Sequence, residues 1–188
     1  MRLLFSLAVA LLAPVVVLAD KEEKKVSSPL SFKMKGLDGK DVDLSKYKGK
    51  VVMFVNVASE CGLTPQYKQL QKLHETYAEK GFVLIGVPAN EFGAQEPGTN
   101  KQIAEFCKKE YNVSFPMLAK VVVKGKGITP LYEVLTSKKS NPKFGGDIGW
   151  NFTKFLVGKD GQVIARFEPR VSPDAQEVID AIEAELKK

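Results

Sequence analysis

Two long apolar segments, residues 51–57 and residues 82–87, dominate the hydrophobic pattern in the first half of the chain. Continuous apolar runs of this length are typical of strands that are buried on both faces of a sheet. Between them, residues 67–77 place Tyr and Leu side chains at helical spacing, and Gly81 ends this segment. A helix between two such strands forms a crossover, so we expect the strands to be parallel.

Shorter elements follow from the same kind of pattern. Residues 32–44 alternate around Asp38-Gly39, which is a hairpin signal, and residues 150–157 and 162–167 are expected to form a second antiparallel hairpin. The other expected elements are a helix capped by Thr64 with Pro65 as its first residue, a helix opened by a capping box at residues 99–102, a strand at 117–123, a short helix at 130–136, a loop at 137–149 and a last helix that Ser172-Pro173 begins.

The order of these elements predicts an α/β fold. A strand–helix–strand crossover, an antiparallel hairpin and a terminal helix together give a central mixed β-sheet flanked by α-helices, with an N-terminal β-hairpin beside it. Cys61 follows the first buried strand, where unpaired N–H groups and the positive end of the helix dipole favour a thiolate. Cys61 is therefore a candidate nucleophile, although its position fits an inert buried cysteine or half of a structural disulfide equally well.

The first residues differ in character from this domain. Arg2 precedes an apolar stretch that leads to Ala19 and a charged segment. This pattern predicts a cleavable signal peptide at residues 1–19, with an uncleaved anchor as the alternative; the stretch is shorter than the ~20 residues that a membrane span needs. We expect an exposed tether at residues 20–30, a domain at residues 31–188, and export to a periplasm or a secretory compartment.

Composition narrows the classes of partner and cofactor. The formal net charge is +6, and the basic residues are spread along the chain rather than gathered in one run. This distribution argues against nucleic-acid binding. The single histidine, His74, and the two cysteines, Cys61 and Cys107, do not match a metal-ligand spacing. We therefore expect neither a metal ion nor a cofactor.

Three segments together carry a specific resemblance. Residues 56–64 (NVASECGLT), 88–98 (PANEFGAQEPG) and 150–155 (WNFTKF) resemble the glutathione peroxidase family, in the order and spacing of that family. General similarity extends over residues 31–169. The resemblance implies a thioredoxin-like fold, although residues 61–64 lack the second cysteine of a C-x-x-C motif. It also implies a peroxidase that acts on hydrogen peroxide and on organic or lipid hydroperoxides.

The catalytic tetrad of that family carries over to Cys61, Gln95, Trp150 and Asn151. The resemblance implies that the Cys61 thiolate attacks a peroxide oxygen and becomes a sulfenic acid. The indole N–H of Trp150 and the amides of Gln95 and Asn151 suit this chemistry, because they can donate hydrogen bonds to the charge on sulfur and oxygen.

Two interpretations of Cys107 stay open. Its helix face is apolar, which favours a buried core thiol. Family members that use thioredoxin carry a resolving cysteine in the same Glu-Phe-Cys context, so the resemblance implies an intramolecular disulfide with Cys61 that a thioredoxin-like protein reduces. Glutathione, acting without a resolving cysteine, is the alternative reductant. The connection at residues 137–149 lacks the insertion associated with tetrameric members of the family, so the resemblance also implies a monomer.

Two other functions are compatible with the same residues. A peroxide-sensing relay would oxidise Cys61 and pass the disulfide to a partner protein. A non-catalytic thioredoxin-fold binding module would hold Cys61 and Cys107 in a permanent disulfide, but it leaves the tetrad unexplained. Asn112 also stands in a glycosylation sequon, which would matter in a eukaryotic secretory route.

Overall fold

A computed structural model describes residues 28–188. The predicted signal peptide at residues 1–19 and most of the predicted tether lie outside the described residues. Pro29 and Leu30, which the sequence assigned to the end of the tether, are buried. The packed part of the chain therefore includes them and does not begin at residue 31.

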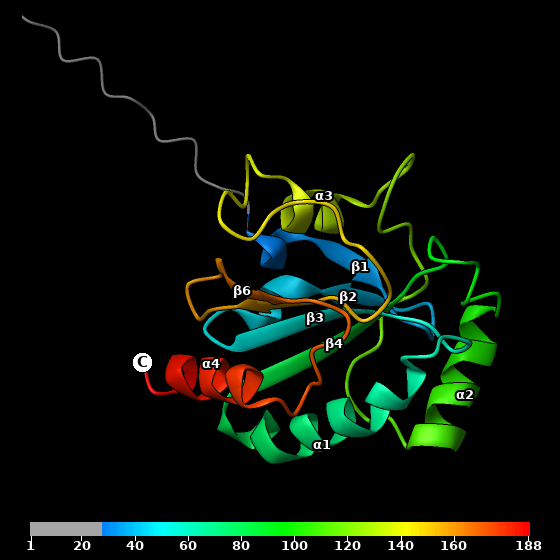
Figure 1. The fold of residues 1–188 in the computed structure, drawn as a ribbon, viewed down its shortest axis with the longest axis horizontal. Coiled ribbons are helices and arrows are strands. Elements are labelled where there is room, and N and C mark those ends of the chain that lie inside the picture. The colour runs from blue at the N-terminus through cyan, green and yellow to red at the C-terminus, as the bar shows by residue number, and fades with distance from the viewer. Residues whose placement is uncertain (1–27) are drawn as a thin grey trace, which may run out of the picture.

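Apart from the strand expected at residues 117–123, the helices and strands follow one another along the chain in the expected order (Figure 1). The helices are α1 (Tyr67–Tyr77), α2 (Asn100–Tyr111), α3 (Pro130–Thr136) and α4 (Gln176–Leu186), and the strands are β1 (Lys33–Lys35), β2 (Asp41–Asp43), β3 (Val51–Val57), β4 (Phe82–Pro88), β5 (Lys154–Val157) and β6 (Val163–Phe167).

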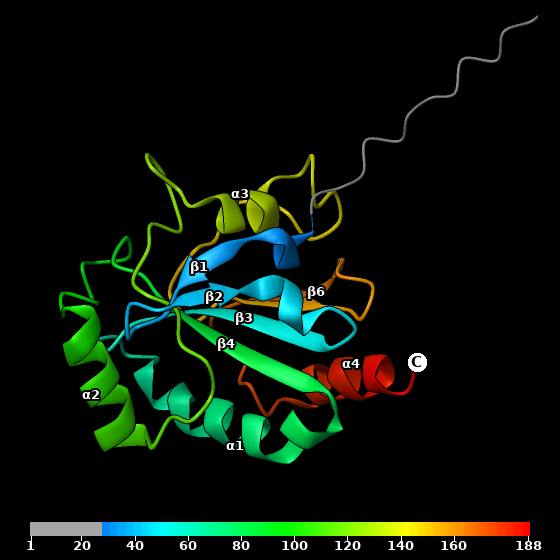
Figure 2. The same ribbon diagram turned by 180° about the vertical axis from the view of Figure 1, so that it is seen from behind.

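The central sheet has the strand order β4-β3-β5-β6 and is mixed. β3 and β4 are parallel, and α1 crosses between them, as the two apolar runs predicted. β5 is antiparallel to both β3 and β6, so the predicted second hairpin is confirmed. β1 and β2 form a separate antiparallel hairpin. Figure 2 shows this hairpin beside the sheet from the opposite side.

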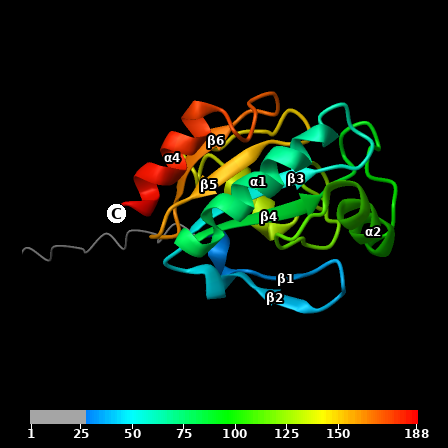
Figure 3. The ribbon, with the colours of Figure 1, turned by 90° about the horizontal axis from the view of Figure 1, so that it is seen from below.

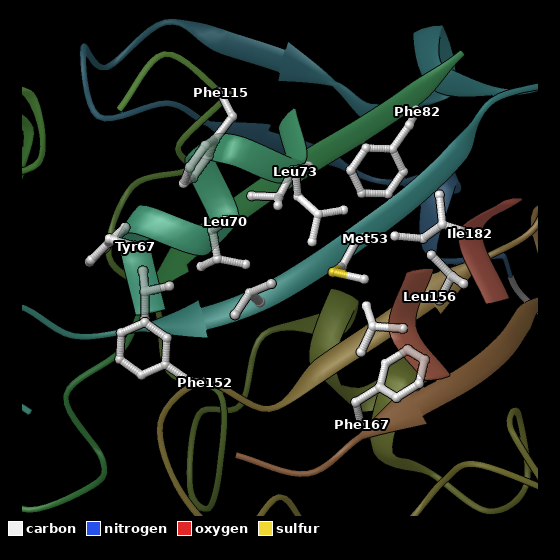
Figure 4. Packing of buried hydrophobic residues seen from close by; sticks show 14 of the residues in the cluster. Met53, Tyr67, Leu70, Leu73, Phe82, Phe115, Phe152, Leu156, Phe167 and Ile182 are labelled. Carbon is white, nitrogen blue, oxygen red and sulfur yellow. The ribbon is translucent and has the colours of Figure 1, made fainter. Parts of the chain in front are cut away.

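Helices cover both faces of the sheet. α1 and α4 lie across one face, and α2 lies at one end of the molecule beside α1 (Figure 3). On this face, Met53 of β3 packs in a cluster with Leu70 of α1 and Ile182 of α4 (Figure 4). Phe54 points to the other face and packs in a cluster with Leu131 of α3. Full burial of each such side chain contributes roughly 1.5–3 kcal/mol, which explains why β3 is apolar at nearly every position.

The expected strand at residues 117–123 does not form. The segment divides its backbone hydrogen bonds between two partners: Leu118 N–H donates to Gly86 of β4 at 2.9 Å, and Ala119 N–H donates to Lys35 of β1 at 2.7 Å. Because it joins the sheet to the hairpin, it pairs with neither over a sufficient length and makes only isolated bridges.

Two boundaries also differ from expectation. α4 begins at Gln176 instead of at residues 172–173, because residues 173–174 first form a turn. β5 begins at Lys154, since residues 150–153 are held in a turn against β3. Within residues 28–188, no helix is both long and apolar enough to cross a membrane.

Candidate active site

Cys61 lies in the loop between β3 and α1. Its side chain is 7% exposed, and the Leu63 N–H donates a hydrogen bond to Sγ at 3.4 Å. Residues 64–66 form a 3₁₀ turn that leads into α1. A backbone donor directed at sulfur stabilises a thiolate more than a thiol, because hydrogen bonds to charged acceptors are stronger. The local backbone therefore suits a sulfur nucleophile.

Thr64 organises this loop and does not cap α1 as the sequence predicted. Its hydroxyl accepts a hydrogen bond from the Cys61 N–H at 3.0 Å and donates one to the Ala58 carbonyl at 2.8 Å. The Thr64 N–H donates to the Cys61 carbonyl at 2.9 Å. Leu63 is the N-cap of the 3₁₀ turn and Gln66 is the N-cap of α1, and neither side chain makes a capping hydrogen bond. Thr64 thus closes the turn that presents Cys61.

Gln95 and Asn151 contact each other through their amides. Asn151 Nδ2 donates to Gln95 Oε1 at 3.1 Å, and Asn151 is fully buried. The Glu60 N–H donates to the Gln95 carbonyl at 3.0 Å, which ties the loop of Gln95 to the residue before Cys61. Ala94 has a φ of 52°, a left-handed conformation that alanine rarely adopts. Such strain is typical of functional loops that the surrounding structure holds in place.

Trp150 lies in the turn that precedes β5. Its side chain is 41% exposed, and its ring lies 5.8 Å from that of Phe92. Its carbonyl accepts hydrogen bonds from Asn56 Nδ2 and Thr153 Oγ1, both at 3.1 Å. Asn56 was not among the predicted site residues, although an amide within an otherwise apolar strand is a signal that could have found it.

Cys61 and Trp150 line one groove with a volume of about 650 Å³. Leu63 and Pro169 form apolar parts of its wall, and Arg170 adds a positive charge. The structure thus brings Cys61 and Trp150 to the same groove and joins Gln95 to Asn151 by a hydrogen bond. Trp150 and Asn151 are consecutive, so the two pairs adjoin at the turn that precedes β5.

Lys154 supports the far wall of this groove, a role that the sequence did not predict. Its side chain is fully buried, and burial lowers the pKa of its ammonium group to about 8. Nζ donates to the Pro169 carbonyl at 3.2 Å and to the Val171 carbonyl. Gln66 Nε2 donates to the same Pro169 carbonyl at 2.8 Å. These contacts fix the segment that carries Arg170.

A comparison with known protein families identifies the family to which the chain belongs. The glutathione peroxidase family profile matches residues 30–136, which is more than half of the chain. The chain belongs to the glutathione peroxidase family.

Individual relatives match most of the chain. The hydroperoxy fatty acid reductase Gpx2 of Synechocystis is 49% identical over 158 residues, which are 84% of this chain and 99% of the relative. The thioredoxin/glutathione peroxidase BtuE of Escherichia coli is 40% identical, over 86% of this chain and 98% of the relative. A crystal structure of Trgpx in its apo form has a TM-score of 0.69 at 36% identity, covering 86% of this chain and 97% of that one. The protein is thus a peroxidase with a thioredoxin-like fold.

Cys107 lies on the buried face of α2. It is 2% exposed, and burial raises the pKa of its thiol to about 11, an effect that the Tyr67 hydroxyl partly offsets. Cys61 and Cys107 are both free thiols in this structure. Within residues 28–188, no group of three or more His, Cys, Asp or Glu side chains is placed to hold a metal ion.

Proposed function

We propose that this peroxidase reduces hydroperoxides through a Cys61 sulfenic acid, that Cys107 resolves the sulfenic acid as an intramolecular disulfide, and that a thioredoxin-like protein reduces the disulfide. One observation carries the proposal. The free thiol of Cys61 lines a groove with Trp150, in a chain whose other cysteine is also free. A binding module with a permanent disulfide fits this state less well.

In the first step, the Cys61 thiolate attacks one peroxide oxygen. The O–O bond breaks, sulfur is oxidised to a sulfenic acid, and the departing oxygen takes up a proton and leaves as alcohol or water. The Leu63 N–H stabilises the attacking sulfur. Trp150 and Asn151 supply N–H donors for the charge that develops on oxygen. The Gln95–Asn151 hydrogen bond orients these amides before substrate arrives.

In the second step, Cys107 Sγ attacks the sulfur of the Cys61 sulfenic acid. The S–O bond breaks, the S–S bond forms, and hydroxide leaves with the thiol proton as water. Because Cys107 is buried on α2, this step needs a local opening of that helix. A glutathione-dependent cycle that leaves Cys107 in the core is the second candidate, and the burial of Cys107 favours it.

The substrate and reductant classes follow from the groove and from the relatives. The Synechocystis relative is named for hydroperoxy fatty acids, and the Escherichia coli relative is named for both thioredoxin and glutathione. The apolar walls at Leu63 and Pro169 suit an alkyl hydroperoxide as well as hydrogen peroxide. We therefore assign organic and lipid hydroperoxides to this site together with hydrogen peroxide.

The place of action and the oligomeric state are part of the same proposal. The apolar leader at residues 1–19 supports export with cleavage, into a periplasm or out of the cell. The short connection at residues 137–149 supports a monomer.

The test is one equivalent of hydrogen peroxide added to reduced protein, followed by intact mass and peptide mapping. We expect the loss of two hydrogens and a Cys61–Cys107 disulfide that thioredoxin reduces. Cys61→Ser should consume no peroxide, and Cys107→Ser should stop at one round of oxidation. Turnover of Cys107→Ser with thioredoxin would contradict the resolving role of Cys107. Turnover of the native protein and of Cys107→Ser with glutathione alone would favour the glutathione-dependent cycle. A disulfide without sustained turnover would indicate a relay.

A further inference from the structure

Glu96 is a buried carboxyl group that the peroxide reaction does not use. Its side chain is fully buried, and neither carboxyl oxygen has a hydrogen-bond partner within residues 28–188. A buried carboxylate without a partner strongly favours its protonated form. Burial accordingly raises the pKa of Glu96 to about 7, and the nearby Ser59 offsets part of this effect although it forms no hydrogen bond with the carboxyl group in this structure.

Glu96 lies between the two cysteine-bearing elements. Ser59, which interacts with its carboxyl group, belongs to the loop that carries Cys61. On the other side, burial raises the pKa of Cys107, and a negative charge on Glu96 raises it further. Glu96 also lines a pocket of about 360 Å³ together with Ile103 and other residues of α2. A charge on Glu96 is therefore felt both by the Cys61 loop and by the helix that carries Cys107.

The surrounding charges do not neutralise Glu96. Glu60 raises its pKa further, because the two carboxylates have the same charge. Lys120 lowers it, but the Lys120 ammonium donates to the carbonyls of Glu96 at 2.9 Å and Gly98 at 2.7 Å, and not to the carboxylate. The nearby Tyr67 hydroxyl and Cys107 thiol add no negative charge at pH 7, because the ordinary pKa values of both lie above 7 and burial raises them further.

The packing of α2 makes it sensitive to such a charge. Of its twelve residues, only Ile103 and Cys107 are buried. A helix with so few buried side chains opens at a lower cost than the elements of the central core. Opening its first turns would uncover the pocket that Glu96 lines and admit water to the carboxylate.

We propose that Glu96 is a positioning residue for the resolving step: its ionised form destabilises the closed α2 helix, so that Cys107 leaves the core and reaches the Cys61 sulfenic acid. The inference rests on the proposed two-cysteine cycle. Glu96 supplies no electrons and no leaving group. The S–S bond still forms as the S–O bond breaks, and water leaves.

The direction of the pH effect follows from the two states of the helix. Glu96 has a pKa of about 7 when α2 is closed and an ordinary value near 4.5 when it is hydrated. As the pH rises from 4.5 to 7, the open form ionises first, so the closed form loses stability. Above pH 7 both forms are ionised and the effect is constant. The opening equilibrium gains a factor on the order of 100 across this window.

The experiment is a stopped-flow measurement of disulfide formation after one equivalent of hydrogen peroxide, between pH 4.5 and 8, followed by the fluorescence of Trp150. Glu96→Gln is compared with the native protein, and Glu105→Gln, which alters an exposed carboxylate of α2, is the matched control. Ionised Glu96 also raises the pKa of the Cys107 thiol, which slows the native protein relative to Glu96→Gln and therefore cannot by itself produce a rise in the ratio of native to Glu96→Gln rates. We expect this ratio to rise at least tenfold up to pH 7 and then level off, while Glu105→Gln follows the native protein.

Hydrogen exchange of the Cys107→Ser protein tests the same inference without any disulfide and without substitution of Glu96. After correction for intrinsic exchange, protection of the α2 amides should fall between pH 5 and 7.5, while that of α4 should not. If the ratio of native to Glu96→Gln rates depends on pH while the protection of the α2 amides does not change, Glu96 acts as a direct proton acceptor, and its proposed role in opening α2 is overturned. A constant ratio would overturn the inference outright. Absence of any disulfide in the native protein would instead refute the two-cysteine cycle, with the exchange result still deciding the effect of Glu96 on α2.

Discussion

Asn56 Nδ2 donates a hydrogen bond to the Trp150 carbonyl at 3.1 Å, which links the interior of β3 to the turn that carries the indole. Asn56 Oδ1 accepts from the Thr153 N–H at 3.0 Å, and the Asn56 carbonyl accepts from the Phe152 N–H at 2.6 Å. Phe152 has a φ of 67°, so the turn needs outside support. One buried amide provides much of that support, and it lies in the same central strand that leads to Cys61.

Replacement of Asn56 by Ala should therefore impair both stability and the first chemical step. The Thr153 N–H would lose its partner and the Trp150 carbonyl one of two donors, which should lower the free energy of unfolding by about 2–3 kcal/mol. Urea denaturation measures this loss. Quenched-flow mass analysis of Cys61 oxidation should show a slower reaction, because the indole is no longer held.

Thr153→Val is the matched variant for this prediction. It removes the hydroxyl that donates to the same Trp150 carbonyl but keeps Asn56 and its two side-chain bonds. We expect a loss of about 1 kcal/mol and a nearly native oxidation rate. Equal effects of the two variants would show that Asn56 has no special part in holding Trp150.

The sheet and helices were predictable because burial dictates their hydrophobic spacing. β3 and β4 are buried on both faces and appear as continuous apolar runs, and Thr99 with Gln102 forms the expected capping box at the start of α2. Residues 117–123 have the composition of a strand, but whether a strand forms depends on a partner of sufficient length. Here the segment bonds partly to β4 and partly to β1, and this depends on the tertiary arrangement, which the local sequence pattern does not show.

The supporting residues of the site were less accessible to sequence reasoning. A threonine before an apolar helix carries the same local signal whether it caps the helix or, as Thr64 does, closes the preceding loop. Glu96 stands in a loop rich in Gly and polar residues, which suggests exposure, yet it is fully buried. Lys154 is a charged residue at the start of the otherwise apolar strand β5, and the Pro169 carbonyl, 15 residues further along the chain, accepts a hydrogen bond from it. Each role depends on contacts between segments far apart in the chain.

Trp150→Phe should slow Cys61 oxidation without unfolding the protein. The substitution keeps an aromatic ring against Phe92 but removes the indole N–H, and the loss of one such donor typically reduces a rate by about 100-fold. Because Trp150 is the only tryptophan, the reaction must be followed by quenched-flow mass analysis and not by fluorescence. A native oxidation rate would remove Trp150 from the catalytic site.

Arg170→Gln should weaken selection for anionic hydroperoxides. Arg170 is exposed beside the groove that contains Cys61, so its charge can attract a fatty-acid carboxylate. We expect the KM for a fatty acid hydroperoxide to rise about fivefold, as for other exposed ion pairs, with little change for its methyl ester or for hydrogen peroxide. Lys50→Gln makes the same change in net charge at the opposite end of β3 and should leave all three substrates unaffected. Equal changes for the acid and the ester would refute a charge interaction.

Lys154→Met should reveal the buried ammonium through the pH dependence of stability. Burial lowers the pKa of Lys154 to about 8 from an ordinary value of 10.5. Below pH 8 the lysine is charged in both the folded and the unfolded protein, and the cost of burying the charge is constant. Between pH 8 and 10.5 the folded protein releases the proton first, so the native protein gains stability relative to Lys154→Met. The gain should approach about 3 kcal/mol.

Urea unfolding of the native protein and of Lys154→Met from pH 7 to 10.5 measures this gain, with Lys50→Met as an exposed control that should follow the native protein. A difference between native and Lys154→Met that stays constant over this range would show that the Lys154 ammonium is hydrated, and that the groove wall at Pro169 does not depend on a buried charge.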